Sequence, residues 1–308
     1  MFASKADNTN KKYKLYFEKF SRWCTLHKLS ALPARSTTVC IYISSLVQQH
    51  VSSSVLDAAF YSINRYHDIS LHPNPCQENL VKLTYEGGKR LLSRPVNKKE
   101  PITVDILDKL VKKFGNDPHN LSNLRICTLC LLGFSGFFRY SELSEIKLKD
   151  LHFSNTHVEV KLSKSKTDTY RKGSSVIIAR TGNILCPVTW LNRYIETAKF
   201  TFGSDEFLFT SVQFCRKLGI YKISNRYSPL SYTRAREILL DALSDIGLDK
   251  TKYCLHSLRS GGVSAAANNQ VSDRLLRVHG RWATNSSKDG YIEENLQNRL
   301  SVSRNLNL

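Results

Sequence analysis

In its last sixty residues the chain carries side chains that could act together on a phosphodiester. His256 and Arg259 are three residues apart, so they share one face if this segment is a helical turn. Trp282 and Tyr291 follow, nine residues apart. A phenolic oxygen can attack a phosphodiester only if the charge growing on the non-bridging oxygens is neutralised, and the fixed fork of arginine donors suits that task. This combination predicts phosphate chemistry with Tyr291 as the nucleophile.

The composition indicates a polyanionic partner. Among 308 residues, 45 are Lys or Arg and 26 are Asp or Glu, which gives a net charge of +19 and a pI near 9.6. The hydrophobic content of 41% is ordinary for a globular protein and argues against a disordered or fibrous chain. Eight cysteines are too sparse for a disulfide scaffold, and neither a bilayer-spanning apolar run nor the apolar region of a signal peptide is evident. We therefore expect a soluble intracellular protein in a reducing compartment, with no membrane partner.

The N-terminal part predicts a compact helical domain at residues 1–93. Hydrophobic residues recur there every three or four positions, and turn residues separate the patterns. The helical patterns cover residues 9–28, 36–50, 53–66 and 77–92. The polar segment 94–102 contains two prolines and has no hydrophobic period, so we expect a linker and a domain boundary there.

Residues 103–308 predict a second domain that is mainly α-helical with a small sheet. Helical patterns cover residues 103–114, 124–138, 186–201, 232–246 and 259–268, and another helix starts at Ser141. Apolar and polar residues alternate from His157 to Leu162, and Val176–Ile178 supplies a second strand after a polar, glycine-containing turn. These strands predict a hairpin with a basic tip, so the fold class is mainly α with a small β-hairpin in the second domain.

Four motifs of the second domain resemble those of the tyrosine recombinases of phage integrase type. Phe138–Leu143 resembles the family's first arginine box, His256–Arg259 its H-x-x-R box, and His279–Trp282 the box that ends in His or Trp. Tyr291 falls where the family places its nucleophile. The resemblance implies a two-domain DNA clamp, with a helical core-binding domain before the linker and a catalytic domain after it. The style of the boxes, with Ser165–Asp168 in the hairpin, looks most like recombinases of eukaryotic mobile elements of the Crypton or DIRS type.

The resemblance also implies roles around the scissile phosphate. Arg139 and Arg259 would clamp the phosphate, and His256 would supply a hydrogen bond or a proton transfer at the same centre. Tyr291 would form a 3′-phosphotyrosyl bond. Because that bond conserves the phosphodiester energy, a 5′-hydroxyl can reverse the step without ATP, a metal ion or another cofactor. Trp282 would pack under the site and donate its indole N–H to a phosphate oxygen.

A carboxylate and a lysine complete the implied catalytic set. Glu142, three residues after Arg139, would orient neighbouring groups. Lys166 would be the general acid that protonates the leaving 5′-oxygen, since family members carry such a lysine on this hairpin, and Lys164 and Lys172 are the alternatives. The implied partner is double-stranded DNA, bound by a homo-oligomer that acts as a tetramer because exchange of two duplexes needs four cut strands.

Basic residues outside these motifs predict contacts with the DNA backbone. Lys11, Lys12, Lys14 and Arg22 lie between the aromatic residues of the first helix. In a chain of this charge we expect them, together with Lys164, to contact phosphates, which positions the DNA without reading its sequence.

Structural alternatives stay open for the same residues. Arg139 and Glu142 alone would form an ordinary surface ion pair at i,i+3 spacing, and Lys166 would be a solvated side chain in a lysine-rich turn. Cys254 beside His256 leaves a zinc site open, although no second ligand pair lies at the spacing of a zinc finger.

Two functional alternatives also stay open. One is a nicking and closing enzyme of the type IB topoisomerase kind, which shares this catalytic set. The other is a domesticated DNA-binding protein that no longer cuts. The protein would act in the nucleus if its host is eukaryotic, and otherwise in the cytoplasm or nucleoid. His279 departs from the family's commoner small or apolar residue at that position, and the sequence predicts no role for it.

Overall fold

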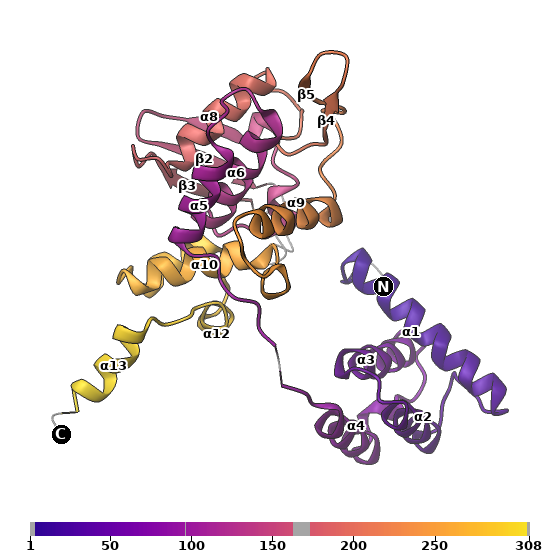
Figure 1. Ribbon diagram of the computed structural model, residues 1–308. Coiled ribbons are helices and arrows are strands. Elements are labelled where there is room, and N and C mark those ends of the chain that lie inside the picture. The colour runs from indigo at the N-terminus through magenta and orange to yellow at the C-terminus, as the bar shows by residue number, and fades with distance from the viewer. Residues whose placement is uncertain (1–3, 96, 163–172, 307–308) are drawn as a thin grey trace. The chain divides into compact units, whose positions relative to one another are not determined.

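The computed structural model describes residues 4–95, 97–162 and 173–306 (Figure 1). The chain divides into two compact units, Met1–Asn97 and Lys98–Leu308, and the division falls inside the segment expected to be a linker. Each unit has its own hydrophobic core. Within the described ranges, no helix combines the length and the apolar character needed to cross a membrane.

The first unit is a helical bundle around an aromatic core (Figure 1). Its helices are α1 (Asp7–Leu26), α2 (Ser36–Gln48), α3 (Ser53–Ile69) and α4 (Asn79–Leu92), with a short 3-10 helix at Pro75–Gln77. Phe17 of α1 stacks on Tyr66 of α3, and Phe60 of α3 stacks on Tyr85 of α4, each with 4.0 Å between ring centroids. The helical patterns expected at residues 9–92 are therefore confirmed, with small differences at the helix ends.

The second unit is built around α6, a helix that is buried on nearly all of its faces. The helices α5, α8, α9 and α10 pack against it. The helices of this unit within the described residues are α5 (Val104–Phe114), α6 (Leu121–Ser135), α7 (Tyr140–Leu143), α8 (Pro187–Ala198), α9 (Tyr232–Asp245), α10 (His256–Asn268), α11 (Asp273–Gly280), α12 (Asn285–Asp289) and α13 (Leu296–Arg304), with 3-10 turns at Leu148–Asp150 and Lys250–Lys252. Because an apolar helix can only be stable when it is covered on every side, α6 fixes the places of the elements around it.

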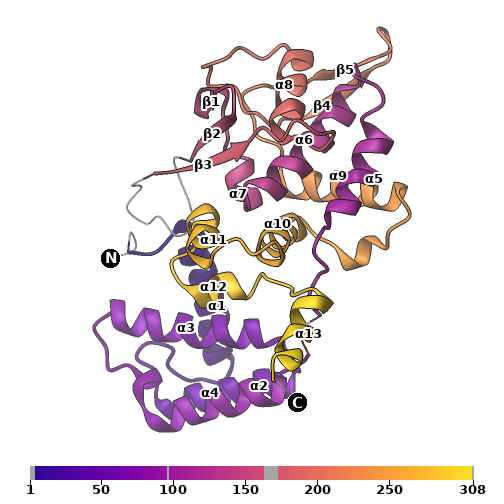
Figure 2. The same cartoon turned by 90° about the vertical axis from the view of Figure 1, so that its left-hand side faces the viewer.

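A three-stranded antiparallel sheet lies beside these helices, in the order β1 (Leu151–Phe153), β2 (His157–Leu162) and β3 (Ser174–Ala179) (Figure 2). Val158 pairs with Ile178 and Val160 with Val176, so the apolar face of the predicted hairpin is confirmed. Its basic tip, with Lys164, Lys166 and Lys172, lies outside the described residues.

Two elements of strand structure were not predicted. β1 is only three residues long, too short for an alternating pattern. The second hairpin, β4 (Val212–Cys215) and β5 (Ile220–Ile223), has no fully buried residue in either strand, so its sequence shows no alternation between an inner and an outer face.

Two consecutive glycines bring α10 very close to its neighbours. A Cβ at Gly261 would collide with the backbone carbonyl of Ile102, and a Cβ at Gly262 would collide with the carbonyl of Phe134 at the end of α6. Since Arg259 lies two residues before Gly261 in the same helix, this approach determines how deeply the Arg259 side chain enters the unit.

The close approach of α10 can be tested with two glycine substitutions. Gly261→Ala should lower the free energy of unfolding of the second unit by about 1–3 kcal/mol, because the neighbouring backbone cannot move aside easily. Gly87→Ala in α4 is the matched control, since a Cβ there meets no atom within 4 Å, and it should stabilise the first unit by about 0.5–1 kcal/mol. Urea unfolding of the full chain measures both, and a Gly261→Ala protein as stable as the wild type would show that α10 is not held in this way.

Candidate active site

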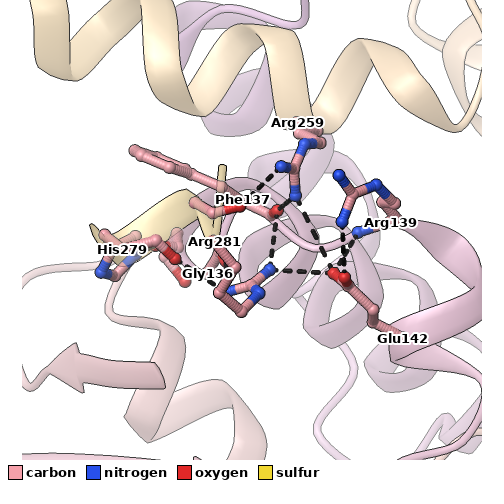
Figure 3. A network of polar contacts seen from close by, with 9 residues as sticks. Gly136, Phe137, Arg139, Glu142, Arg259, His279 and Arg281 are labelled. Atoms are coloured by element: carbon pink, nitrogen blue, oxygen red, sulfur yellow. Dashed lines mark hydrogen bonds and ion pairs between the residues drawn. The ribbon is translucent and has the colours of Figure 1, made fainter. Parts of the chain in front are cut away.

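Three arginines of the second unit surround the carboxylate of Glu142 (Figure 3). Nη1 of Arg139 lies 2.8 Å from Oε1 of Glu142, Nη2 of Arg281 lies 2.9 Å from Oε2, and Nη1 of Arg259 lies 3.8 Å from Oε2. The Glu142 side chain is 1% exposed and the Arg259 side chain is fully buried, whereas the Arg139 side chain is 12% exposed. Three positive charges and one negative charge leave a net charge of +2, so this cluster is suited to an anion.

The turn between α6 and α7 places Arg139 and Glu142. The chain leaves α6 at Ser135, turns through Gly136 and Phe137, and starts α7 with Arg139 as the N-cap. The backbone N–H of Arg139 donates to Oε2 of Glu142 at 2.9 Å, which satisfies an amide at the start of the helix. A single carboxylate therefore caps α7 and orients the arginine at its start.

The pKa of the Glu142 carboxyl lies below its usual range. Burial alone would raise this pKa, but Arg281, the backbone N–H of Arg139, and the guanidiniums of Arg139 and Arg259 together outweigh burial. Glu142 is therefore ionised at neutral pH, and the energy of the network depends on that charge.

The Arg259 guanidinium lies between this network and two aromatic rings. Nη2 donates to the carbonyl of Gly280 at 2.7 Å, and Nη1 donates to the carbonyl of Phe137. The guanidinium carbon lies 4.2 Å from the ring centroid of Trp282 and 5.2 Å from that of Tyr291. Burial, followed by the charge of Arg139, lowers the pKa of Arg259 to about 9, so this arginine keeps its charge at neutral pH.

Trp282 and Tyr291 belong to a small core directly beneath the arginines. Trp282 packs with Phe137, Val263 and Leu276, and Tyr291 lies against this cluster with its ring centroid 5.6 Å from that of Trp282. Within the described part of the chain, Nε1 of Trp282 and Nε of Arg259 are buried donors with no hydrogen-bond partner. Buried donors are usually satisfied, so both atoms fit a site that receives an acceptor from outside the chain.

A buried lysine holds the short helix that precedes Tyr291. Nζ of Lys288 lies 2.5 Å from a carboxylate oxygen of Asp273 in α11 and 3.0 Å from one of Asp289 in α12. Burial would lower the pKa of Lys288, but hydrogen bonds to the two aspartates outweigh it and raise that pKa. The backbone N–H of Tyr291 donates to the carbonyl of Lys288 at 2.9 Å, so the ion pairs between α11 and α12 also fix the position of the tyrosine.

His256 and Tyr291 line the same hollow, which has a volume of about 240 Å³. His256 is the first residue of α10 and is exposed, while Arg259, one turn later, points inward. Cys254 and Ser257 also line this hollow, together with Lys98, Lys99, Ser260, Gly290 and Glu293. The imidazole therefore lies at the tyrosine side of the site.

The structure thus brings together six of the residues that the sequence singled out, namely Arg139, Glu142, His256, Arg259, Trp282 and Tyr291. The surface ion pair considered for Arg139 and Glu142 is wrong, because the carboxylate is buried and bound to more than one arginine. Across residues 4–95, 97–162 and 173–306, no three His, Cys, Asp or Glu side chains are grouped so as to hold a metal ion. Lys166 and its alternatives lie outside the described residues.

The basic residues of the first helix lie in the other unit. Lys11, Lys12, Lys14 and Arg22 are all on the exposed face of α1, whose opposite face buries Phe17, Phe20 and Cys24. Lys14 lies 4.0 Å from Glu18, a weak exposed ion pair. Their exposure is compatible with contacts to a polyanion.

Two residues of the site have roles that the sequence did not predict. Arg281 is the third arginine of the network. His279 forms a hydrogen bond of 2.8 Å between its Nε2 and the carbonyl of Ser135, and its ring packs edge to face on Phe137 with 4.7 Å between centroids. Both residues fall inside the His279–Trp282 motif, but contacts with a segment more than a hundred residues earlier leave no local pattern.

Comparison with known proteins gives a family, one related sequence and two solved structures with a similar fold. Residues 101–298 match the family described as Phage integrase family. An integrase/recombinase xerD homolog of Selenomonas ruminantium is 30% identical over 295 residues, which cover 94% of this chain and 83% of that protein. The XerH site-specific recombinase bound to a palindromic difH substrate has a similar fold, with a TM-score of 0.65 and 15% identity over 96% of this chain and 78% of that one. A lambda integrase dimer bound to a COC′ core site gives a TM-score of 0.60 and 15% identity, covering 95% and 90% of the two chains.

The contribution of the buried Glu142 carboxylate to the stability of the fold can be measured with Glu142→Gln. This change leaves two buried guanidiniums and the partly exposed one of Arg139 without their anion, so it should lower the free energy of unfolding by about 3–5 kcal/mol at pH 7. Because the folded-state pKa of Glu142 is depressed, its contribution is present above the unfolded value near 4.5 and is lost as the pH falls through the folded value. Urea unfolding between pH 7 and pH 3 should therefore show the difference from wild type shrinking below about pH 4.5.

Glu237→Gln provides the control for this measurement. Glu237 also pairs with an arginine three residues away, at 3.1 Å from Arg234, but both side chains are exposed. Its substitution should change the free energy of unfolding by less than about 1 kcal/mol. Equal effects of the two substitutions would contradict the role assigned to Glu142.

Proposed function

The chain belongs to the phage integrase family of tyrosine recombinases, and on that premise we propose that it cleaves and rejoins duplex DNA at specific sites through a covalent bond to Tyr291. The observation that carries this proposal is the convergence of two arginine side chains, an indole and a tyrosine on one place. The guanidinium of Arg259 links them, because it lies over the rings of Trp282 and Tyr291 and shares Glu142 with Arg139.

The proposed step is an exchange of one phosphodiester for another. The phenolic oxygen of Tyr291 attacks the phosphorus, a bond from that oxygen to phosphorus forms, and the bond to the 5′-oxygen breaks. The phenolic proton is released, and the leaving 5′-oxygen gains one. A later attack by a 5′-hydroxyl on the phosphotyrosyl bond reverses the step, so the energy of the bond is conserved and the exchange needs no ATP and no metal ion.

The positive charge of the site stabilises the transition state of this step more than it stabilises the bound phosphodiester. A phosphodiester carries one negative charge, and a second develops on the non-bridging oxygens as the tyrosine adds. The net charge of +2 on the three arginines and Glu142 complements that increase. The buried N–H groups of Arg259 and Trp282 would each gain an acceptor when a phosphate is bound.

Proton transfer is assigned to His256 and Lys166 in this proposal. His256, in the hollow with Tyr291, is placed to exchange a hydrogen bond or a proton at the tyrosine side. Lys166 stays the predicted acid for the leaving 5′-oxygen.

The proposed partner is double-stranded DNA, held by both units. The net charge of +19 and the exposed Lys11, Lys12, Lys14 and Arg22 on α1 support contacts with the phosphate backbone. In this proposal residues 1–93 are the helical core-binding domain, residues 103–308 are the catalytic domain, and Lys164 adds a further phosphate contact. Since two duplexes must be cut on four strands, the active form is a homotetramer on DNA, located wherever the host keeps its DNA.

Covalent capture of DNA by Tyr291 tests the proposed step directly. Wild-type protein and Tyr291→Phe are incubated with a pool of nicked duplexes in EDTA, and adducts that survive denaturant are counted on gels. Wild type should form adducts and Tyr291→Phe none, because the substitution removes only the attacking oxygen, while the DNA dissociation constants of both stay similar. Adducts with Tyr291→Phe at the wild-type rate would overturn the assignment. Tight binding without adducts from either protein would favour the domesticated DNA-binding protein.

A further prediction concerns Arg139, the arginine at the edge of the site. Arg139→Ala should slow adduct formation at saturating DNA by about 10²–10³-fold, because a donor to the developing charge is lost. Arg139 is the most exposed of the three arginines, so its loss disturbs the core least. The exposed Arg193→Ala on α8 is the control and should keep the wild-type rate. A normal rate for Arg139→Ala would remove Arg139 from the phosphate site.

A further inference from the structure

Arg281 adopts a backbone conformation that arginine rarely takes. It is the residue after α11, with φ 56° and ψ 43° in the left-handed region, and Phe137, which it contacts, has φ 46°. Both conformations favour glycine, and bulky residues keep them only where the surrounding structure requires it. Outliers of this kind gather at functional sites, so the contact between Arg281 and Phe137 calls for a physical explanation.

The left-handed turn sends the Arg281 side chain back toward the end of α6. Nη1 donates to the carbonyl of His279 at 2.7 Å and to that of Gly136 at 3.3 Å. Nη2 donates to the carbonyl of Phe137 at 3.1 Å and to Oε2 of Glu142 at 2.9 Å. The side chain is 6% exposed. Its fork is thus directed at protein oxygens, and it acts on the site through the groups that it holds.

The groups held by Arg281 also hold the two arginines proposed to bind phosphate. The carbonyl of Phe137 accepts from Arg281 and from Arg259. Glu142 accepts from the guanidinium of Arg139 with one oxygen and from that of Arg281 with the other (Figure 3). Without Arg281, Oε2 of Glu142 would have Arg259, now 3.8 Å away, as its remaining cationic partner, and the net charge of the cluster would fall from +2 to +1.

Arg281 also connects two parts of the site that are far apart in sequence. It directly precedes Trp282 in the segment that leads to Tyr291, while its acceptors Gly136, Phe137 and Glu142 belong to the turn that carries Arg139. His279, through its hydrogen bond to the Ser135 carbonyl and its ring on Phe137, and the small apolar cluster of Phe137 and Trp282 also join the two segments. Of these contacts the fork is the one that reaches Glu142, so it sets the tyrosine segment in register with the carboxylate that holds Arg139.

We propose that Arg281 is a positioning residue for strand cleavage, which holds Glu142 and the Phe137 carbonyl so that Arg139 and Arg259 stay aligned on the phosphate opposite Tyr291. This role rests on the proposed function. It differs from mere stabilisation, because it affects the rate of the chemical step at saturating DNA and leaves DNA affinity nearly unchanged.

The chain offers a matched control at Arg226. This arginine donates to a carboxylate oxygen of Glu206 at 3.0 Å and to the carbonyls of Ala198 and Lys199 at 2.8 Å and 3.1 Å. Its fork thus has the same kinds of partner as that of Arg281, but it joins other segments of the second unit. Arg226→Lys removes a comparable fork without touching the arginine network.

The test compares Arg281→Lys, Arg281→Gly and Arg226→Lys in the full chain, on the duplex recovered from wild-type adducts. Arg281→Lys keeps the charge and loses the fork, while Arg281→Gly fits the left-handed backbone and loses both. Both should slow adduct formation at saturating DNA by about 10- to 100-fold, with Arg281→Gly the slower, and dissociation constants should stay within about twofold of wild type. Arg226→Lys should keep the wild-type rate. Wild-type rates for both Arg281 variants, or equal slowing by Arg226→Lys, would overturn the proposal.

Amide hydrogen exchange separates failure of this proposal from failure of the proposed function. If wild type forms no adduct with the nicked pool, the function fails on that result alone. Exchange at residues 136–142 should still be faster in Arg281→Gly than in wild type, and unchanged there in Arg226→Lys, because Arg281 fixes that turn. Unchanged exchange in Arg281→Gly would overturn the positioning role whatever the adducts show.

Discussion

One buried carboxylate organises the second unit of this protein around the proposed active site. Placing three guanidiniums inside a folded unit is strongly unfavourable unless an anion and well-placed carbonyls compensate for the lost water. Glu142 and the carbonyls of Phe137 and Gly280 supply that compensation. Because these acceptors come from α7, the turn before it and the end of α11, the network can form only when α7, α10 and α11 are in place. Assembly of the site therefore requires these elements to be packed together.

The surrounding helices restrict how the site can move. Gly261 and Gly262 let α10 approach the backbone of Ile102 and Phe134, which leaves little room for Arg259 to shift. On the other side, Lys288 joins α11 to the short helix before Tyr291. Tyr291, the proposed nucleophile, and the charges that would serve it are thus attached to elements fixed by different forces, close packing for the arginine and ion pairs for the tyrosine.

The parts of the fold that the sequence predicted are those with a local pattern. The amphipathic helices show a repeat of three to four residues, β2 alternates because it has one buried face, and β3 is a short apolar run after a turn. Arg139, Arg259 and Tyr291 could be selected because the order and spacing of their motifs resemble a known family. By contrast, β4 and β5 lack a buried face. The roles of Arg281 and His279 arise from contacts across the chain, and a left-handed backbone at an arginine has no signature in the residue type.

The left-handed conformation at Arg281 also affects which substitutions the backbone can accept at this position. Glycine is the residue that fits such a backbone best, and arginine codons can become glycine codons through a single base change. One substitution that a single base change can produce is therefore also the one the backbone accepts with least strain, yet it removes a charge from the centre of the network. Backbone strain therefore does not oppose a glycine at position 281, and what opposes it is the loss of the contacts that the arginine makes with Glu142 and the turn before it.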